Sequence, residues 1–186
     1  MTATDHVPAV LSLELYRREL VGKPCRPVDK TDDVLPLIDR MVLFARVHGG
    51  VGLAAPQIGV YIQLAIAIIA PGVTEALINP EITNLAGRDL FEAEGCLSLP
   101  PYGQATARVW RSETVHIVTG CVQEPEARMA RVYTGAAARI VQHEIDHLNG
   151  IYFIDHCGPV AKGIVLRRFN QFLRQQGAER EQLAYG

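Results

Sequence analysis

The stretch Gln142-His143-Glu144-Ile145-Asp146-His147 lies in a segment, residues 134–148, that we predict to be helical. Thr134 would cap this helix at its start, and Asn149-Gly150 would end it. Because His143 and His147 are four residues apart, both imidazoles project from one helix face and can bind one divalent metal ion. The carboxylate of Glu144 can then reach a metal-bound water as a general base. The alternative is a solvated helix with two ordinary histidines and an ion-paired glutamate.

A catalytic metal site usually has three protein ligands, so this helix needs a partner. Asp155 and His156 follow the helix but lack the extended zincin spacing. Upstream, Cys96 stands in Glu94-Gly95-Cys96-Leu97-Ser98-Leu99-Pro100, where its thiolate would complete a Cys/His/His set. A small buried core residue is the alternative for this cysteine. The other three cysteines have no such context, and we interpret them as structural: Cys25, Cys121 and Cys157.

Composition places the chain among ordinary globular proteins. It has 186 residues, of which 48% are hydrophobic and 20% charged, and its formal net charge is −2. These values predict one folded domain over residues 1–186, and they argue against DNA binding through bulk positive charge. Four scattered cysteines favour reduced thiols and a cytoplasmic location. No basic segment followed by an apolar one opens the sequence, and residues 64–70 are too short to cross a membrane.

The remaining pattern predicts an α+β fold. We expect a helix over residues 34–47 with its cap within Thr31-Asp32-Asp33, and a last helix over about residues 160–175 that leads into a tail. Residues 12–20 look helical or irregular. Strands are predicted at residues 60–69, 76–82, 108–118 and 151–154. Because strands cluster in the middle and helices at the ends, we expect mixed, mainly antiparallel sheets packed around the central helix that carries HExxH.

The glycine-rich stretch Gly50-Val51-Gly52-Leu53-Ala54-Ala55 matches the loose dinucleotide pattern GxGxxA. We reject that interpretation because the stretch follows a helix rather than a strand, and Pro56 disrupts the phosphate-binding helix. Two interpretations stay open. The stretch forms a tight turn, or its backbone lies against a substrate with the Gln57 amide supplying a hydrogen bond.

Three segments, in this order, resemble the peptide deformylases of the bacterial and organellar type. They are Gly50-Val-Gly-Leu-Ala-Ala-Pro-Gln57, Glu94-Gly-Cys-Leu-Ser98 and Gln142-His-Glu-Ile-Asp-His147, and the resemblance spans about residues 15–155. It implies a metal-dependent hydrolase that removes the N-formyl group from the formyl-methionine of nascent polypeptides and releases formate.

The resemblance also implies a role for each motif residue. Cys96, His143 and His147 would hold the metal, typically Fe²⁺, with Zn²⁺, Ni²⁺ or Co²⁺ able to substitute. A metal-bound hydroxide would attack the formyl carbon, with Glu144 as general base and then acid. The Gln57 side-chain amide and the Leu97 backbone N–H would hold the oxyanion.

Substrate contacts are implied on both sides of this centre. The backbone of residues 50–52 would pair with an extended substrate, and the expected substrate-binding set is Gly50, Val51, Gly52, Glu94, Gly95, Ala136 and Ile140. Glu94 would pair with Arg111, although an unrelated surface arginine is an equal alternative. Asp146 would be an ion-pair residue. The last helix is core packing or, with its arginines, a transient contact to ribosomal RNA.

Two departures from the family pattern leave the substrate open. Alanines stand at residues 136–138, where relatives often have larger apolar side chains, and the loop over residues 101–107, with Tyr102, is long. A specialised deformylase acting on a non-methionine or small-molecule N-formyl amine is therefore one alternative. An HExxH endopeptidase and a non-catalytic, ribosome-associated metal-binding module are two others.

Overall fold

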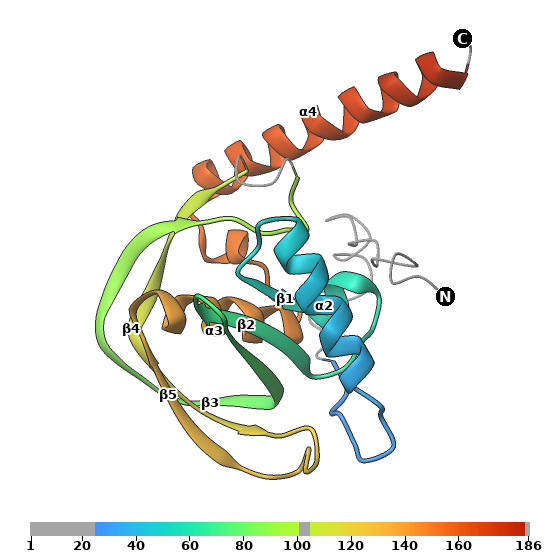
Figure 1. The fold of residues 1–186 in the computed structure, drawn as a ribbon. Helices are drawn as coiled ribbons and strands as arrows, with labels where there is room; N and C mark the ends of the chain where they lie inside the picture. The colour runs from blue at the N-terminus through green and yellow to red at the C-terminus, as the bar shows by residue number, and fades with distance from the viewer. Residues whose placement is uncertain (1–24, 101–104, 185–186) are drawn as a thin grey trace.

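Figure 1 shows the protein as a computed structural model, which describes residues 25–100 and 105–184 and the side chains of this part up to residue 176. Five strands form one sheet in the order β1-β2-β3-β4-β5, and each pairs antiparallel with its neighbour. The strands are β1 (Gly52–Ala54), β2 (Leu64–Ala70), β3 (Val73–Glu94), β4 (Ala107–Gly120) and β5 (Met129–Thr134).

The helices lie around this sheet. They are α2 (Leu35–Val47), α3 (Gly135–Leu148) and α4 (Pro159–Ala184), with short 3₁₀ turns η1 (Ala55–Ile58) and η2 (Phe153–His156). The long strands β3 and β4 curve around α3, and α4 extends away from the body of the molecule (Figure 1). The α+β class and the predominantly antiparallel sheet around the HExxH helix are thus confirmed. The strands form one sheet, and the parallel pairing in the described residues is a single bridge from Arg26 to Ile62.

Irregularities in β3 allow it to bend around the helix. Its pairing with β4 changes register between Ile78 and Glu81, between Ile82 and Asn84, and again between Ala86 and Asp89. Bulges of this kind add local twist and curvature to a strand. The bend carries the end of β3 over α3 and sets Glu94 and Cys96 beside the two helix histidines.

The core consists of three clusters that enclose α3 and its surroundings. The apolar face of α3 packs against β2, β3, β4 and β5 through Val141, Ile145, Leu148, Leu77, Val115, Ile117 and Tyr133. A second cluster joins α2 to β1 and β2 through Met41, Phe44, Leu53, Leu64 and Ile66. The third seats α4 through Val165 and Phe169 on Tyr152, Phe153 and Cys96.

Several predicted elements differ in extent. The strand over 76–82 is part of the much longer β3, and the helix over 160–175 is part of α4. The strand over 60–69 begins only at Leu64, because η1 ends at Gly59 in a left-handed conformation and residue 62 makes a single bridge. The strand over 108–118 and the helix over 134–148 are confirmed within two residues.

Two local predictions are wrong, and a third holds for position alone. Residues 151–154 form no strand, because Asp155 accepts a hydrogen bond from the Tyr152 N–H (3.0 Å) and closes the turn η2. The cap of α2 is Val34, with no side-chain bond, since the Asp32 carboxylate is bound instead by Arg26 at 2.7 Å. Thr134 occupies the cap position of α3 but makes no capping bond from its side chain.

The strands β1 and β5 were not predicted. Residues 12–20 and Tyr102 lie outside the described residues.

Candidate metal centre

Helix α3 presents His143 and His147 one turn apart on the face toward the end of β3. Their Nε2 atoms lie 3.1 Å apart, and the Cys96 Sγ lies 3.2 Å from the Nε2 of His147. One ligand atom from each of the three residues falls within 4.8 Å of the others, and all three side chains are buried. The structure therefore brings together the cysteine and the two histidines that the sequence singled out.

This donor set fits a divalent metal ion. One thiolate and two imidazoles are soft and borderline ligands that suit zinc or iron. Burial lowers the pKa of His147 well below its usual range, so its ring is neutral, as ligation requires. Burial also acts to lower the pKa of His143, but hydrogen bonds to Cys96 and Glu94 outweigh it and raise that pKa. A metal cation on the same thiolate would satisfy the negative charge that otherwise favours this proton.

Gln57 approaches the thiol from the other side of the site. Its Nε2 donates to the Cys96 Sγ at 3.3 Å and to the Ser98 Oγ at 3.0 Å, and its Oε1 accepts from the Ala54 N–H at 2.8 Å. The side chain is buried within η1, whose start is fixed by Pro56. The amide donor is thus held at the candidate ligand Cys96.

Glu144 is enclosed beside the centre. Burial raises its pKa to about 7, and its Oε2 has no hydrogen-bond partner within the described residues. Gly52 lies so close to the carboxylate that a methyl group at this glycine would overlap the Glu144 Oε1. A carboxyl group with a pKa near neutrality can both accept and return a proton.

The carboxylate of Glu94 contacts the Nδ1 of His143, the ring nitrogen on the side away from the ligand cluster. Its Oε2 lies 3.0 Å from the His143 Nδ1, and Arg111 binds the same carboxylate through its Nε (2.9 Å) and its second terminal nitrogen (3.1 Å). Burial acts to raise the pKa of Glu94, but the bonds from His143 and Arg111 outweigh it and hold the pKa well below its usual range. An ionised carboxylate orients the ring so that Nε2 faces the ligand cluster. The Glu94–Arg111 pair is therefore present and buried.

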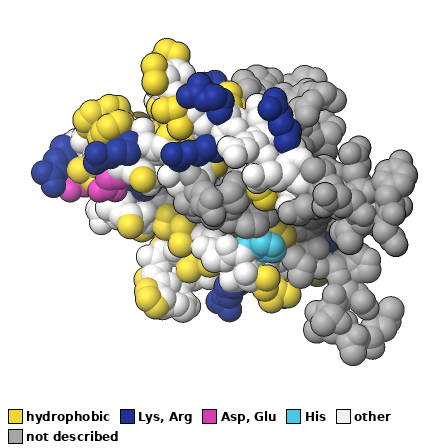
Figure 2. All heavy atoms as spheres, turned by 90° about the horizontal axis from the view of Figure 1, so that it is seen from above, with side chains coloured by type: hydrophobic (Ala, Val, Ile, Leu, Met, Phe, Trp, Pro, Cys, Tyr) yellow, Lys and Arg dark blue, Asp and Glu magenta, His cyan; other side chains and the backbone are white. Residues whose placement is uncertain are grey.

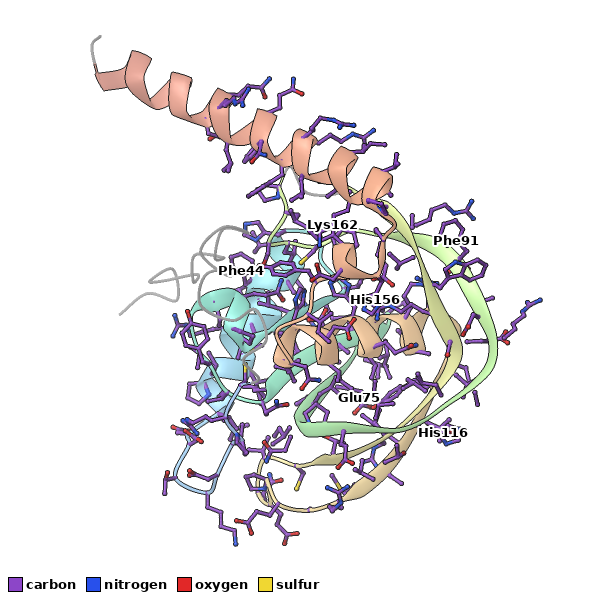
Figure 3. All side chains as sticks on the ribbon, turned by 180° about the vertical axis from the view of Figure 1, so that it is seen from behind. Phe44, Glu75, Phe91, His116, His156 and Lys162 are labelled. Carbon is purple, nitrogen blue, oxygen red and sulfur yellow. The ribbon has the colours of Figure 1, made fainter. Side chains whose placement is uncertain are left out.

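The outer end of this network accounts for the downstream residues. Asp146 pairs with Arg111 and, at 2.7 Å, with the Nε2 of His156. Asp155 pairs with Lys162 of α4. Figure 3 shows His156 between α3 and the segment that leads to α4. Neither Asp155 nor His156 belongs to the ligand cluster, so among the described residues no third ligand lies downstream of the helix, as an HExxH endopeptidase would require.

A cavity of about 390 Å³ opens onto this centre. The expected site residues that line it are Gly50, Val51, Gly52, Gln57, Glu94, Gly95, Cys96, Leu97, Ile140, His143 and Glu144. Ala136 does not line this cavity: it is exposed one helical turn before Ile140, because the wall contributed by α3 begins at Arg139. The expected role of Ala136 in substrate binding stays a prediction.

Two residues of the site were missed. Ser98 receives the Gln57 amide, and Arg139 lines the cavity and donates to the Glu94 Oε1 at 2.8 Å. Arg139 precedes His143 by four residues, so the helical period predicts that the two side chains lie on the same face of the helix. Its partner is 45 residues away in sequence, and no local pattern reveals it.

The three remaining cysteines are outside the ligand cluster and free. Burial raises the pKa of Cys25 to about 11, and it also raises the pKa of Cys157. Raised values of this kind keep a thiol protonated and unreactive. Cys25 and Cys157 therefore fit the structural role expected of them.

Comparisons with known proteins agree with this geometry. The sequence profile of the family described as "Polypeptide deformylase" matches residues 10–162. A peptide deformylase of Thermodesulfovibrio yellowstonii is 38% identical over 166 residues, which cover 87% of this chain and 97% of that protein. One of Thermotoga petrophila is 36% identical over 161 residues, covering 83% of this chain and 93% of the relative.

Solved structures show the same fold. The crystal structure of a peptide deformylase from Legionella pneumophila superposes with a TM-score of 0.79 at 31% identity, covering 92% of this chain and 98% of that one. A peptide deformylase from Synechococcus elongatus, in complex with actinonin, superposes with a TM-score of 0.78 at 28% identity, covering 91% and 90%.

Fold and site together define a metal-dependent hydrolase, in which a buried carboxylate stands beside a Cys/His/His cluster. The chain belongs to the polypeptide deformylase family, whose members remove the N-formyl group from nascent peptides.

Proposed function

We propose that this chain hydrolyses the N-formyl group of formyl-methionine at the N-terminus of nascent polypeptides and releases formate. The observation that carries this proposal is the position of Glu144, buried in the cavity next to the three ligands with a pKa raised to about 7. The family membership supports the same reaction.

Cys96, His143 and His147 would hold one divalent ion, which when bound acidifies a water molecule and polarises the formyl oxygen. We propose Fe²⁺ as the native ion, with Zn²⁺, Ni²⁺ or Co²⁺ as functional substitutes. A thiolate with two imidazoles accepts each of them, so the family resemblance supports the choice of iron.

Glu144 moves the proton. Its carboxylate takes a proton from the attacking water and returns it to the departing amine nitrogen. A pKa near 7 serves both steps at neutral pH, because neither protonation state is strongly favoured.

Gln57 and Leu97 stabilise the oxyanion. The Gln57 Nε2 is held beside Cys96, where one of its two N–H groups would turn from the Cys96 Sγ or the Ser98 Oγ to the oxyanion, and the Leu97 backbone N–H belongs to the segment that follows Cys96 along the cavity wall. Donors held in place before the reaction lose no reorganisation energy when charge develops on the formyl oxygen.

The substrate backbone would lie along β1. This strand stands first in the sheet order, so it pairs with β2 on one side, and residues 50–52 line the cavity. An extended peptide can add to such an outer strand through main-chain hydrogen bonds. Gly95 and Ile140 would flank the first side chain from the opposite walls.

Formate release tests the proposal. Protein loaded anaerobically with Fe²⁺ should release formate from N-formyl-Met-Ala-Ser, and analogues with other first residues measure the preference for methionine. Absence of formate from every formyl peptide would reject the function, whereas release that ignores the first residue would favour the specialised deformylase.

We also propose a transient ribosome contact through α4. Arg167, Arg168 and Arg174 are exposed on this helix, and Figure 2 shows Lys and Arg side chains gathered on the face seen from above. Exposed cations bind phosphate in a salt-dependent way. Replacing the three arginines by glutamate should abolish co-sedimentation with ribosomes at low salt without changing formate release from a short peptide. Unchanged co-sedimentation would refute the contact.

A cytoplasmic location and a single catalytic domain over residues 1–186 complete the proposal. The free thiols and the need for a reduced Cys96 support the location, and the family match over residues 10–162 supports the domain. Separately, no helix of the described part of the chain is long and apolar enough to span a membrane.

A further inference from the structure

Three side chains converge on the carboxylate of Glu94. Its Oε1 accepts from the Arg111 Nε (2.9 Å) and from a terminal nitrogen of Arg139 (2.8 Å). Its Oε2 accepts from the other arm of Arg111 (3.1 Å) and faces the His143 Nδ1 at 3.0 Å. A carboxylate has about four lone-pair directions, so this group is saturated by two arginines and a candidate metal ligand.

Arg139 is anchored independently of Arg111. It donates to the carbonyl oxygens of Leu90 (2.8 Å) and Val109 (3.3 Å), and its Nε lies 3.3 Å from the Glu92 carboxylate. These contacts tie α3 to β3 and β4, the two strands that carry Glu94 and Arg111. These contacts fix the position of the Arg139 guanidinium independently of its hydrogen bond to Glu94.

Charge balance points the same way. Within the buried network, the carboxylates of Glu94 and Asp146 face the guanidiniums of Arg111 and Arg139. Without Arg139, the buried Glu94 and the partly buried Asp146 would share one arginine, and an unbalanced buried charge is costly. The second arginine thus balances the charge of Glu94 and holds its carboxylate where the Oε2 faces the His143 Nδ1.

We propose that Arg139 is a positioning residue for the metal centre: it fixes the Glu94 carboxylate, which in turn directs the Nε2 of His143 toward Cys96 and His147. The inference rests on the proposed metal-binding function of this site. Arg139 acts through Glu94 and His143 and takes no part in proton transfer. Since Arg139 also lines the cavity beside Ile140, direct contact with the substrate is the competing explanation.

Metal affinity measured without substrate separates the two roles. Holoenzyme loaded with Zn²⁺ or Co²⁺ is titrated with a competing chelator, and the Co²⁺ form is followed by its visible absorption spectrum. We expect Arg139→Gln to bind either ion about 10- to 100-fold more weakly, which is typical for loss of a group that orients a ligand, and to change the Co²⁺ spectrum. Arg131→Gln is the matched control, because it removes the same charge from an exposed side chain of β5 and should leave both readouts unchanged.

Kinetics on formyl-Met-Ala-Ser add a second readout. At saturating metal, Arg139→Gln should lower kcat and leave KM within about twofold, because a misdirected ligand affects the chemical step and not substrate binding. Arg139→Lys should be intermediate, since a single ammonium cannot serve Glu94 and the two carbonyls together.

Two results overturn the inference. The first is unchanged metal affinity and an unchanged Co²⁺ spectrum with a raised KM, which would make Arg139 a substrate contact. The second is a lower melting temperature with unchanged metal affinity, which would make it purely structural.

If Arg139→Gln does not fold, Arg139→Lys decides. Several-fold weaker metal binding supports the role, and wild-type binding refutes it. If the wild type releases no formate while Arg139→Gln still weakens metal binding, the proposed function fails and this inference stands.

Discussion

Helices α3 and α4 both follow the helical period, but they differ in what surrounds them. Nine of the 14 residues of α3 are buried, and five of these are polar or charged: Arg139, Gln142, His143, Glu144 and His147. On α4, the buried residues within the described side chains are Val165 and Phe169. Phe91 lies on neither helix: Figure 3 shows its side chain on the outer surface of β3.

This difference in buried polar residues shows that α3 is the helix that carries the candidate site. Burying a polar side chain is costly unless it is hydrogen-bonded, so each buried polar residue of α3 requires a specific partner on another element. Glu94 supplies such a partner for Arg139 and His143, and Cys96 supplies one for His147. Among the described side chains of α4, no polar residue is buried, so this requirement does not arise there.

The largest expected effect is on the metal. His147→Ala should weaken metal binding by at least about 100-fold, because it removes a ligand outright, whereas changes to groups behind the ligands cost 10- to 100-fold. Gln175→Ala on the exposed side of α4 is the matched control and should bind metal as the wild type does. Metal content after dialysis measures both, and equal retention by the two variants would abolish the distinction between the helices.

The second-largest effect is expected at the cavity wall that faces α3, where Gln57 lies. Gln57→Ala should lower kcat for formyl-Met-Ala-Ser about 10²- to 10³-fold, close to 3 kcal/mol, because a fixed oxyanion donor is lost. Metal content should be retained, since the three ligands remain. Steady-state kinetics check the prediction, and a kcat within twofold of the wild type would remove Gln57 from the mechanism.

The smallest contrast concerns stability. Leu148 of α3 is fully buried, and Leu148→Ala should lower the free energy of unfolding by about 2–5 kcal/mol. Leu173 of α4 is 38% exposed, and Leu173→Ala should cost less than about 1 kcal/mol. Urea denaturation of the metal-loaded protein compares the two. Equal losses would show that α4 is packed as tightly as α3.

The same contrast explains what the sequence could predict. His143, Glu144 and His147 lie in one short stretch, and its helical period places the two histidines on one face. β4 alternates over enough residues to be recognised. Long helices and strands with a regular hydrophobic period are the elements that a sequence predicts best.

The rest depends on contacts between distant residues. β1 has three residues, too few for a period, and the outer half of β3 contains Gly87 and Asp89, which are poor strand formers. The turn η2 replaces a predicted strand because Asp155 bonds the backbone of Tyr152. The approach of Arg139 to Glu94 arises only when β3 bends over α3.

In the proposed mechanism, Glu144 moves the proton at a metal centre that other residues hold. Formate release from formyl-Met-Ala-Ser and metal content should be measured together for the wild type and Glu144→Ala. The variant should keep its metal and lose turnover by about 10²- to 10⁴-fold, the usual contribution of general acid–base catalysis. Turnover at the wild-type level in metal-loaded Glu144→Ala would contradict this mechanism.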